Sequence, residues 1–175
     1  NLAAKGVELA IEAVKKLGEA MIDVGKQAIE SYASYEQLTG GMDTLFKSSS
    51  GKMKQYAAEA YKTAGMSANE YMETATSFAA TLITSVGGDT EKAAEQANKA
   101  IIQMSDNANK MGTSLESIQD AYRGFAKENY DMLDNLSLGY SGTKEGMQQL
   151  LKDATALSGV KYDINSYSDI IDAIG

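Results

Sequence analysis

Apolar residues between positions 65 and 128 recur with the period of an α-helix in three successive runs. Because a helix turns once every 3.6 residues or so, side chains at this spacing share one face. The runs predict three amphipathic helices, each with one face for a core. The expected core residues are Tyr71, Ala75, Phe78, Leu82 and Val86 in the first, Ala93, Ala97, Ala100, Ile101, Met104, Ala108 and Met111 in the second, and Leu115, Ile118, Tyr122 and Phe125 in the third.

Capping residues predict where these helices begin. Ser67 followed by Glu70 forms a capping box, in which the serine hydroxyl accepts the Glu70 amide, and Thr113 with Glu116 repeats the pattern. Asp89 is expected to cap the helix between them. All three helices therefore start at positions that the local sequence specifies.

Glycines predict where the first two helices end. Gly87, Gly88 and Gly112 are free to adopt the left-handed conformation that stops a helix. The short linkers that follow predict antiparallel hairpins between consecutive helices. Glycine, serine, phenylalanine and alanine at 65, 67, 78 and 79 recur at 112, 114, 125 and 126, so Phe78 and Phe125 are expected to meet or to occupy equivalent places in two hairpins.

Residues 3–38 carry apolar side chains in a heptad pattern, which predicts one long amphipathic helix. We expect Gly40–Gly41 to break or kink it, ahead of a polar loop at 47–52, with a hinge near residues 40–51. One face of this helix forms a candidate self-association seam, made up of Val7, Ile11, Val14, Gly18, Met21, Gly25, Ala28 and Tyr32.

The glycines of the seam have two interpretations. Each of Gly18 and Gly25 weakens a helix by about 1 kcal/mol relative to alanine, which is compatible with a poorly optimised surface helix. Glycine on a packed seam also allows a partner helix to approach closely. The seam itself has two candidate partners, a second copy of the chain or the remaining helices of the same chain.

The pattern divides the chain into three parts and predicts an all-α fold. Residues 1–47 form the long helix, residues 52–159 form a multi-helix bundle, and residues 160–175 form a linker and a truncated helix. Within the bundle, Lys52 to Ala64 is helical with Met53, Tyr56, Ala57, Ala60, Tyr61 and Ala64 on one face. Thr143 opens another helix, which ends at Gly159 and buries Met147, Leu150, Leu151, Ala154 and Leu157.

Composition excludes several classes of function. The chain has neither cysteine nor histidine, which removes the thiolate nucleophile, the usual general base and the commonest metal ligands. With 24 acidic and 16 basic residues, the net charge of −8 argues against binding to nucleic acid. No apolar run approaches the roughly 18 residues of a transmembrane span. We therefore expect no enzyme activity, no cofactor and no membrane span.

Three patterns resemble sites of known chemistry, and each has a simpler structural interpretation. Residues 139–144 contain the glycines and lysine of a phosphate loop, but at the wrong spacing and with no preceding strand, so a turn and a Thr143 cap are favoured. Residues 106–112 lack the ligand spacing of a calcium loop and suit a helix end. Three pairs of acids are spaced for one helix face and are expected to serve as capping groups: Glu70 with Glu73, Asp131 with Asp134, and Asp169 with Asp172.

Five segments together resemble the tail tape measure proteins of long-tailed bacteriophages and prophages. They are YEQLTGGMDTLF at 35–46, YKTAGMSANEYMETATSFAATL at 61–82, GGDTEKAAEQA at 87–97, MSDNANKMGTS at 104–114 and GFAKENYDMLDNLSLGYSGTKEGMQQLLKDA at 124–154. The similarity covers most of the chain, in order and at natural spacing. The family has no catalytic motif in this region.

The resemblance implies a long, mostly helical parent protein whose length sets the length of the tail. The tail-tube protein polymerises around such a chain, which leaves the tube during infection. The implied partners are copies of the chain itself, the tail-tube protein and tail assembly chaperones, and the implied location is the virion after assembly in the bacterial cytoplasm. Because the periodic pattern is still running at Ile174, we expect an internal segment of a longer protein.

Two other hypotheses remain at the level of sequence. The chain could be a secreted or membrane-acting helical effector, but charges of both signs alternate along residues 5–26, whereas anionic membranes attract a basic face. It could also be an enzyme that uses carboxylates or a Ser–Lys pair, which requires a pocket that holds two carboxylates close together.

Overall fold

The computed structural model describes residues 15–16 and 30–175, and the chain divides into two compact units, residues 1–37 and 38–175. The described residues of the first unit are helical. Most of the long helix predicted for residues 3–38, and most of its seam, lies outside the described residues. The second unit is described throughout, and the rest of this section concerns it.

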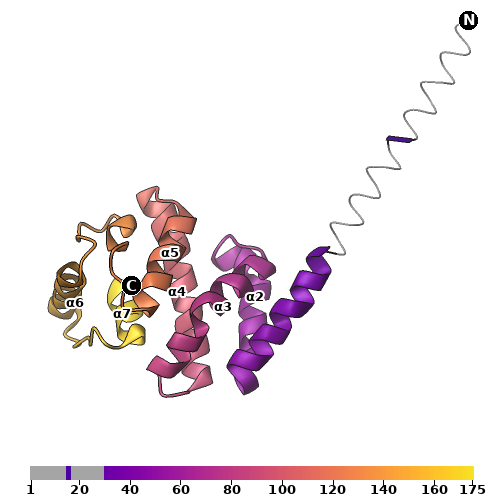
Figure 1. Ribbon diagram of the computed structural model, residues 1–175, viewed down its shortest axis with the longest axis horizontal. Coiled ribbons are helices and arrows are strands. Elements are labelled where there is room, and N and C mark those ends of the chain that lie inside the picture. The colour runs from indigo at the N-terminus through magenta and orange to yellow at the C-terminus, as the bar shows by residue number, and fades with distance from the viewer. Residues whose placement is uncertain (1–14, 17–29) are drawn as a thin grey trace, which may run out of the picture. The chain divides into compact units, whose positions relative to one another are not determined.

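The second unit is an all-α bundle, which confirms the predicted fold class, and none of the described residues forms a strand (Figure 1). Its helices follow a segment, residues 38–46, that is also helical. The α-helices are α2 (Ser50–Thr63), α3 (Ala68–Ser85), α4 (Thr90–Met111), α5 (Leu115–Ala126), α6 (Lys144–Ser158) and α7 (Tyr167–Ile174), and the 3-10 helices are η1 (Lys47–Ser49) and η2 (Leu133–Leu136).

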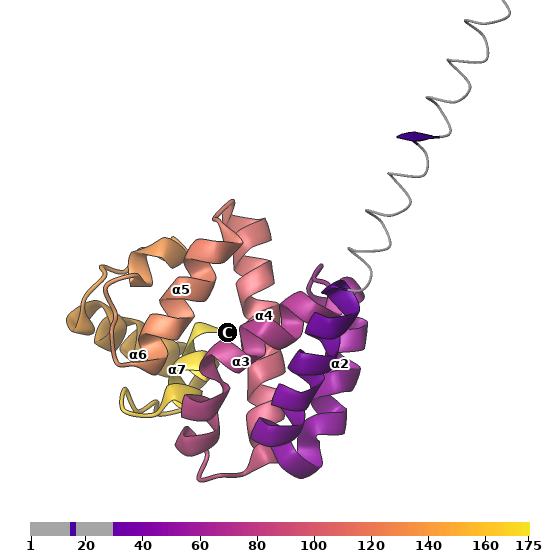
Figure 2. The ribbon, with the colours of Figure 1, turned by 45° about the vertical axis from the view of Figure 1, so that its right-hand side comes forward.

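Helix α4 lies at the centre of this unit, in contact with α2, α3, α5, α7 and η1. Figures 1 and 2 show α2 and α6 at opposite ends, with α3, α4 and α5 between them. Among the helices, α6 packs mainly on α7, and α7 in turn contacts α3, α4 and α5. The C-terminal helix therefore joins α6 to the rest of the bundle.

Most of the predicted caps are present. The Ser67 hydroxyl accepts the Glu70 amide at 3.1 Å, and the Asp89 carboxylate accepts the Lys92 amide at 3.1 Å. The Thr143 hydroxyl accepts a further amide at the start of α6. Helices α3, α4 and α6 thus begin where a side-chain oxygen satisfies a free N–H group of the first turn.

Thr113, in contrast, is not the cap of α5, so that prediction is wrong. The helix starts one residue later, after Ser114, whose side chain makes no capping hydrogen bond. The Thr113 hydroxyl lies 3.0 Å from Oδ1 of Asn107 and 3.3 Å from the Asn107 carbonyl oxygen. Because the end of α4 offers these acceptors, the threonine closes that helix and does not open the next.

The predicted break at Gly40–Gly41 is also wrong, because the helix continues through both glycines to residue 46. Two glycines weaken a helix by about 1 kcal/mol each, and the complete burial of Met42 and Phe46 after them outweighs that cost. The chain turns at Lys47, which has a left-handed φ of 48°. The segment predicted to be a polar loop forms η1 and the start of α2.

The core extends beyond the predicted bundle of residues 52–159. It includes Met42 and Phe46 on one side and Tyr167, Ile170 and Ile171 of α7 on the other. Most residues of the predicted stripes are buried, although Tyr61, Met111 and Leu157 at the ends of their helices are exposed. Phe78 and Phe125 are both buried, and their closest ring partners are tyrosines: Tyr167 for Phe78, and Tyr122 and Tyr130 for Phe125.

Replacing Phe78 or Phe125 by alanine should lower the free energy of unfolding by about 3–5 kcal/mol, because each leaves a cavity in a closed core. Urea denaturation followed by circular dichroism measures the loss. Tyr61→Ala is the matched control, since an aromatic side chain that is 82% exposed should change stability by less than about 0.5 kcal/mol. A loss below about 1 kcal/mol at both phenylalanines would contradict the assigned helix faces.

Candidate functional site

The candidate self-association seam is described by the structure at one of its positions. Tyr32 is 63% exposed, and Tyr35, three residues later, is 43% exposed. The other seam residues, from Val7 to Ala28, lie outside the described residues. The seam thus stays a prediction, with its last residue on a helical segment whose aromatic side chains are largely accessible.

The segment that resembles a phosphate loop forms a packed turn. Gly139 adopts a left-handed φ of 88°, and a Cβ atom at Gly142 would collide with the carbonyl oxygen of Asp131. Backbone carbonyl, not open space, therefore faces this glycine. The Thr143 hydroxyl caps α6 through the amide of Gly146 at 3.0 Å, as the structural interpretation predicted.

The segment at 106–112 and the acid pair Asp169 and Asp172 also have structural roles. The Asn107 amide nitrogen donates to the carbonyl oxygen of Leu136 at 2.9 Å, which ties the end of α4 to η2. Asp172 pairs with Lys99, and Asp169 accepts the backbone amide of Asp163 at 2.9 Å. No group of acids within residues 15–16 and 30–175 is arranged to hold a metal ion.

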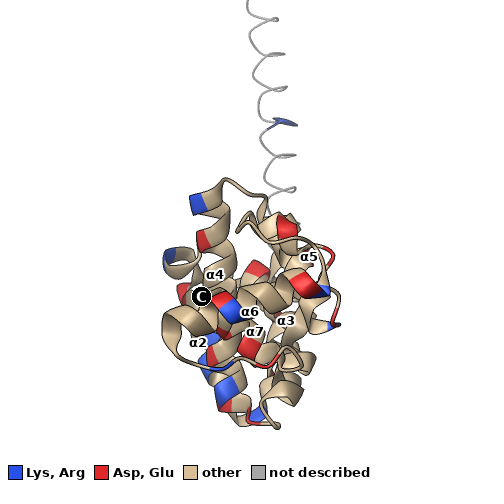
Figure 3. Ribbon diagram, turned by 90° about the vertical axis from the view of Figure 1, so that its left-hand side faces the viewer, with Lys and Arg blue, Asp and Glu red and all other residues tan. Residues whose placement is uncertain are grey.

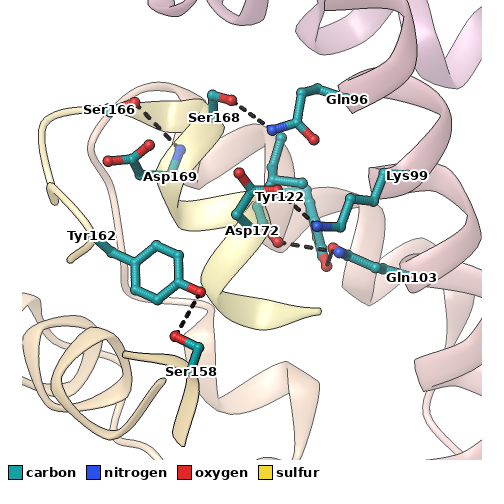
Figure 4. A network of polar contacts seen from close by, with 11 residues as sticks. Gln96, Lys99, Gln103, Tyr122, Ser158, Tyr162, Ser166, Ser168, Asp169 and Asp172 are labelled. Atoms are coloured by element: carbon teal, nitrogen blue, oxygen red, sulfur yellow. Dashed lines mark hydrogen bonds and ion pairs between the residues drawn. The ribbon is translucent and has the colours of Figure 1, made fainter. Parts of the chain in front are cut away.

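A network of polar contacts holds α7 against α4 (Figure 4). The Gln96 amide donates to the Ser168 hydroxyl at 2.7 Å, and both side chains are buried. One turn further, Lys99 Nζ lies 2.7 Å from the Asp172 carboxylate. Next along α4, Gln103 donates to the Ile171 carbonyl at 3.1 Å. Successive turns of α4 thus bind successive turns of α7.

The same network continues into α5 through two tyrosines. The Tyr122 hydroxyl donates to Gln103 Oε1 at 3.0 Å, and the Tyr167 hydroxyl donates to the Tyr122 carbonyl at 2.9 Å. Figure 4 shows the Tyr122 side chain reaching the network from beside α7. Side chains from three helices therefore fix the position of α7, and sequence periodicity gave no indication of these cross-helix contacts.

Burial changes the chemistry of three tyrosines. Desolvation raises the pKa of the Tyr71, Tyr122 and Tyr167 phenols well above their ordinary value. Each hydroxyl also donates a hydrogen bond, that of Tyr71 to Asn98 at 2.7 Å. A phenol that is neutral and already bonded is a structural group, because a phenolate in this environment would lack solvation.

An open groove of about 360 Å³ lies between the end of α3, the end of α5 and the start of α7. Phe125, Tyr167 and Ile170 contribute apolar or aromatic surface to it, and Thr81, Thr84 and Glu128 contribute polar groups. Glu128 has a left-handed φ of 57° two residues after the end of α5. Other helix ends of this bundle use glycine for a left-handed residue. This groove holds one carboxylate, not the close pair that the enzyme hypothesis requires.

The exposed ends of α4 and α6 carry apolar side chains that the periodic pattern had assigned to the core. Met111 is 44% exposed and Leu157 is 91% exposed. Leu138, which belongs to no predicted helix, is 37% exposed. It lines two surface hollows, one of which Met111 also lines and the other of which Leu157 also lines. Each residue is at the end of its helix, so the register was right, but no helix within the described part of the chain covers it.

Comparison with known proteins gives no relative on which to base an assignment: no family model, no curated protein and no solved structure matches this chain. None of the described helices is long and apolar enough to cross a lipid bilayer. Functional inference therefore starts from the described residues, which form packed helices with structural polar contacts and exposed apolar side chains at helix ends.

Alkaline pH should unfold the bundle. The unfolded tyrosines release protons near pH 10, whereas Tyr71, Tyr122 and Tyr167 keep theirs in the fold because burial raises their pKa. Stability is thus complete below pH 10 and falls above it by about 1.4 kcal/mol per pH unit for each group. Urea titrations between pH 8 and 11 measure this slope. Tyr71→Phe should reduce this slope by about 1.4 kcal/mol per pH unit, and an unchanged slope would show that burial does not hold the proton on Tyr71.

Removing the Ser168 hydroxyl should lower the free energy of unfolding markedly, although only one oxygen atom is lost. Ser168→Ala leaves the buried Gln96 amide without its acceptor, which costs about 1–3 kcal/mol. Ser158→Ala is the control, because that hydroxyl is exposed and its partners lie at the surface. Equal stability of the two variants in thermal unfolding would show that the Gln96–Ser168 contact does not hold α7.

Proposed function

We propose that this chain is a non-catalytic structural segment of a phage tail tape measure protein, which helps to set tail length and occupies the lumen of the tail tube. The observation that carries the proposal is the order and natural spacing of the five resembling segments along residues 35–154. No single segment is specific by itself, and the proposal depends on their occurrence together.

The fold is compatible with a structural role. From residue 38 onward, the resembling segments extend from the helical residues before η1 through α2, α3, α4, α5 and α6, so this part of them belongs to one packed bundle. Within that bundle, Ser67, Asp89 and Thr143 serve as caps, and Lys99 and Asp172 pair across helices. These side chains hold the fold together.

The N-terminal seam provides the association surface in this proposal. Helices of neighbouring copies would cover Val7, Ile11, Val14 and the rest of the seam, because a single amphipathic helix leaves an apolar stripe in water. The tail-tube protein and tail assembly chaperones are the other partners. The protein would assemble in the bacterial cytoplasm and remain in the virion until infection.

In-frame deletions in the gene of the parent protein test this function. Removing residues 52–111 should shorten the tails, and removing residues 52–159 should shorten them further, by up to about 1.5 Å for each helical residue lost. Electron micrographs of released tails give the lengths, and a duplication of residues 52–111 is the control, which should lengthen them. Tails of unchanged length in particles that contain the shortened protein would refute the proposal.

A further inference from the structure

The exposed apolar side chains at the ends of α4 and α6 belong to one surface, which we term the C-terminal face. Two hollows meet on it, with Leu138 and Ile174 in the lining of both. The first, of about 280 Å³, is beside α4 and has Met111 in its lining. The second, of about 240 Å³, is beside α6 and has Leu157 in its lining. The face therefore continues from one helix end to the other.

This combination differs from ordinary surface exposure. Single apolar side chains are common on protein surfaces, whereas contiguous ones mark sites of interaction. On the C-terminal face, Leu157 is 91% exposed beside one hollow and Met111 is 44% exposed beside the other. The face thus has both projecting apolar groups and the spaces to receive them.

We propose that the C-terminal face binds the same face of a second copy of this chain, around a two-fold axis. Such an axis lies in the interface and passes near Leu138 and Ile174, at right angles to the line from Met111 to Leu157. It brings the α4 side of each copy opposite the α6 side of the other. Met111 of one copy then enters the hollow beside α6 of its partner, while Leu157 of the partner enters the hollow beside α4.

Charge complementarity selects this arrangement. Lys110 lines the hollow beside α4, and Asp153 lines the hollow beside α6. The proposed axis places each lysine opposite an aspartate, whereas an axis along the line between them would place like charges together. Asp106 also lines the α4 hollow, so Lys110 offsets an acidic group on that side. The Lys110 ammonium forms no ion pair with any described residue.

The remaining charges of this side of the molecule do not oppose such contact. Figure 3 shows acidic and basic residues interspersed on the side that carries α6 and α7, without a field of one sign. Asp153 accepts hydrogen bonds from Tyr140 at 2.7 Å and from Gln149 at 2.8 Å, which fix the position of its carboxylate. The acid is therefore oriented before the partner arrives.

The inference is independent of the phage tail proposal, because it uses a different surface from the N-terminal seam. Analytical ultracentrifugation of the 175-residue chain tests it. Leu157→Glu should weaken dimerisation at least tenfold, because it removes the apolar contact with Met111, Leu138 and Ile174 of the partner's hollow and desolvates a carboxylate there. Tyr61→Glu is the matched control, since Tyr61 is also highly exposed but lies on α2, away from the face. Circular dichroism should show both variants folded.

Charge reversal tests the direction of the two-fold axis. Lys110→Glu should weaken the dimer because it opposes Asp153 of the partner, and Lys110→Arg should not. The Lys110→Asp and Asp153→Lys variants should each dimerise poorly alone and should form a dimer when mixed, since both contacts then join opposite charges. Failure of the mixed pair, with both variants folded, would overturn the proposed axis.

Val14→Glu separates this interface from the seam. It should leave dimerisation through the C-terminal face unchanged. The proposal is overturned if the chain stays monomeric up to about 1 mM, if Tyr61→Glu weakens association as much as Leu157→Glu does, or if Val14→Glu alone abolishes it. The tail-length experiment is unaffected by any of these results, so the two proposals fail separately.

Discussion

The bundle depends on the close approach of its helices to the alanine-rich helix α4. Ala93, Ala94, Ala97 and Ala100 are fully buried, and such small side chains allow neighbours to approach on several sides at once. A helix with large residues at these positions would hold its neighbours further away and leave gaps between them. The arrangement of α2, α3, α5 and α7 around one axis follows from this property of α4.

Small side chains allow helices to approach closely but do little to determine which packing arrangement forms. The polar residues of α4 provide that specificity. Thr90 bonds to η1, Asn98 to α3, Gln96 to α7, Gln103 to α5, and Ser105 to the carbonyl of Ala64 at the end of α2. Within the described residues, no buried side-chain nitrogen or oxygen lacks a hydrogen-bond partner. Because a mispaired amide inside the bundle would be costly, these contacts favour one packing over its alternatives.

Local features of this fold could be predicted from the sequence, whereas features that depend on distant residues could not. The caps at Ser67 and Asp89 involve a few neighbouring residues, so their sequence signatures were sufficient. The helix through Gly40 and Gly41 persists because Met42 and Phe46 are buried by other elements, which no local pattern reveals. Leu157 is exposed because no described helix lies over the end of α6, which periodicity does not reveal, so the pattern placed it in the core and missed the C-terminal face.

The position of α6 has a consequence for how the bundle opens. Because α6 meets the other helices mainly through α7, it loses its attachment whenever α7 leaves α4. The two helices should therefore exchange their amide hydrogens as one cooperative unit, at a free energy below that of global unfolding. An eight-residue helix would then set the local stability of both α6 and α7, residues 144–174.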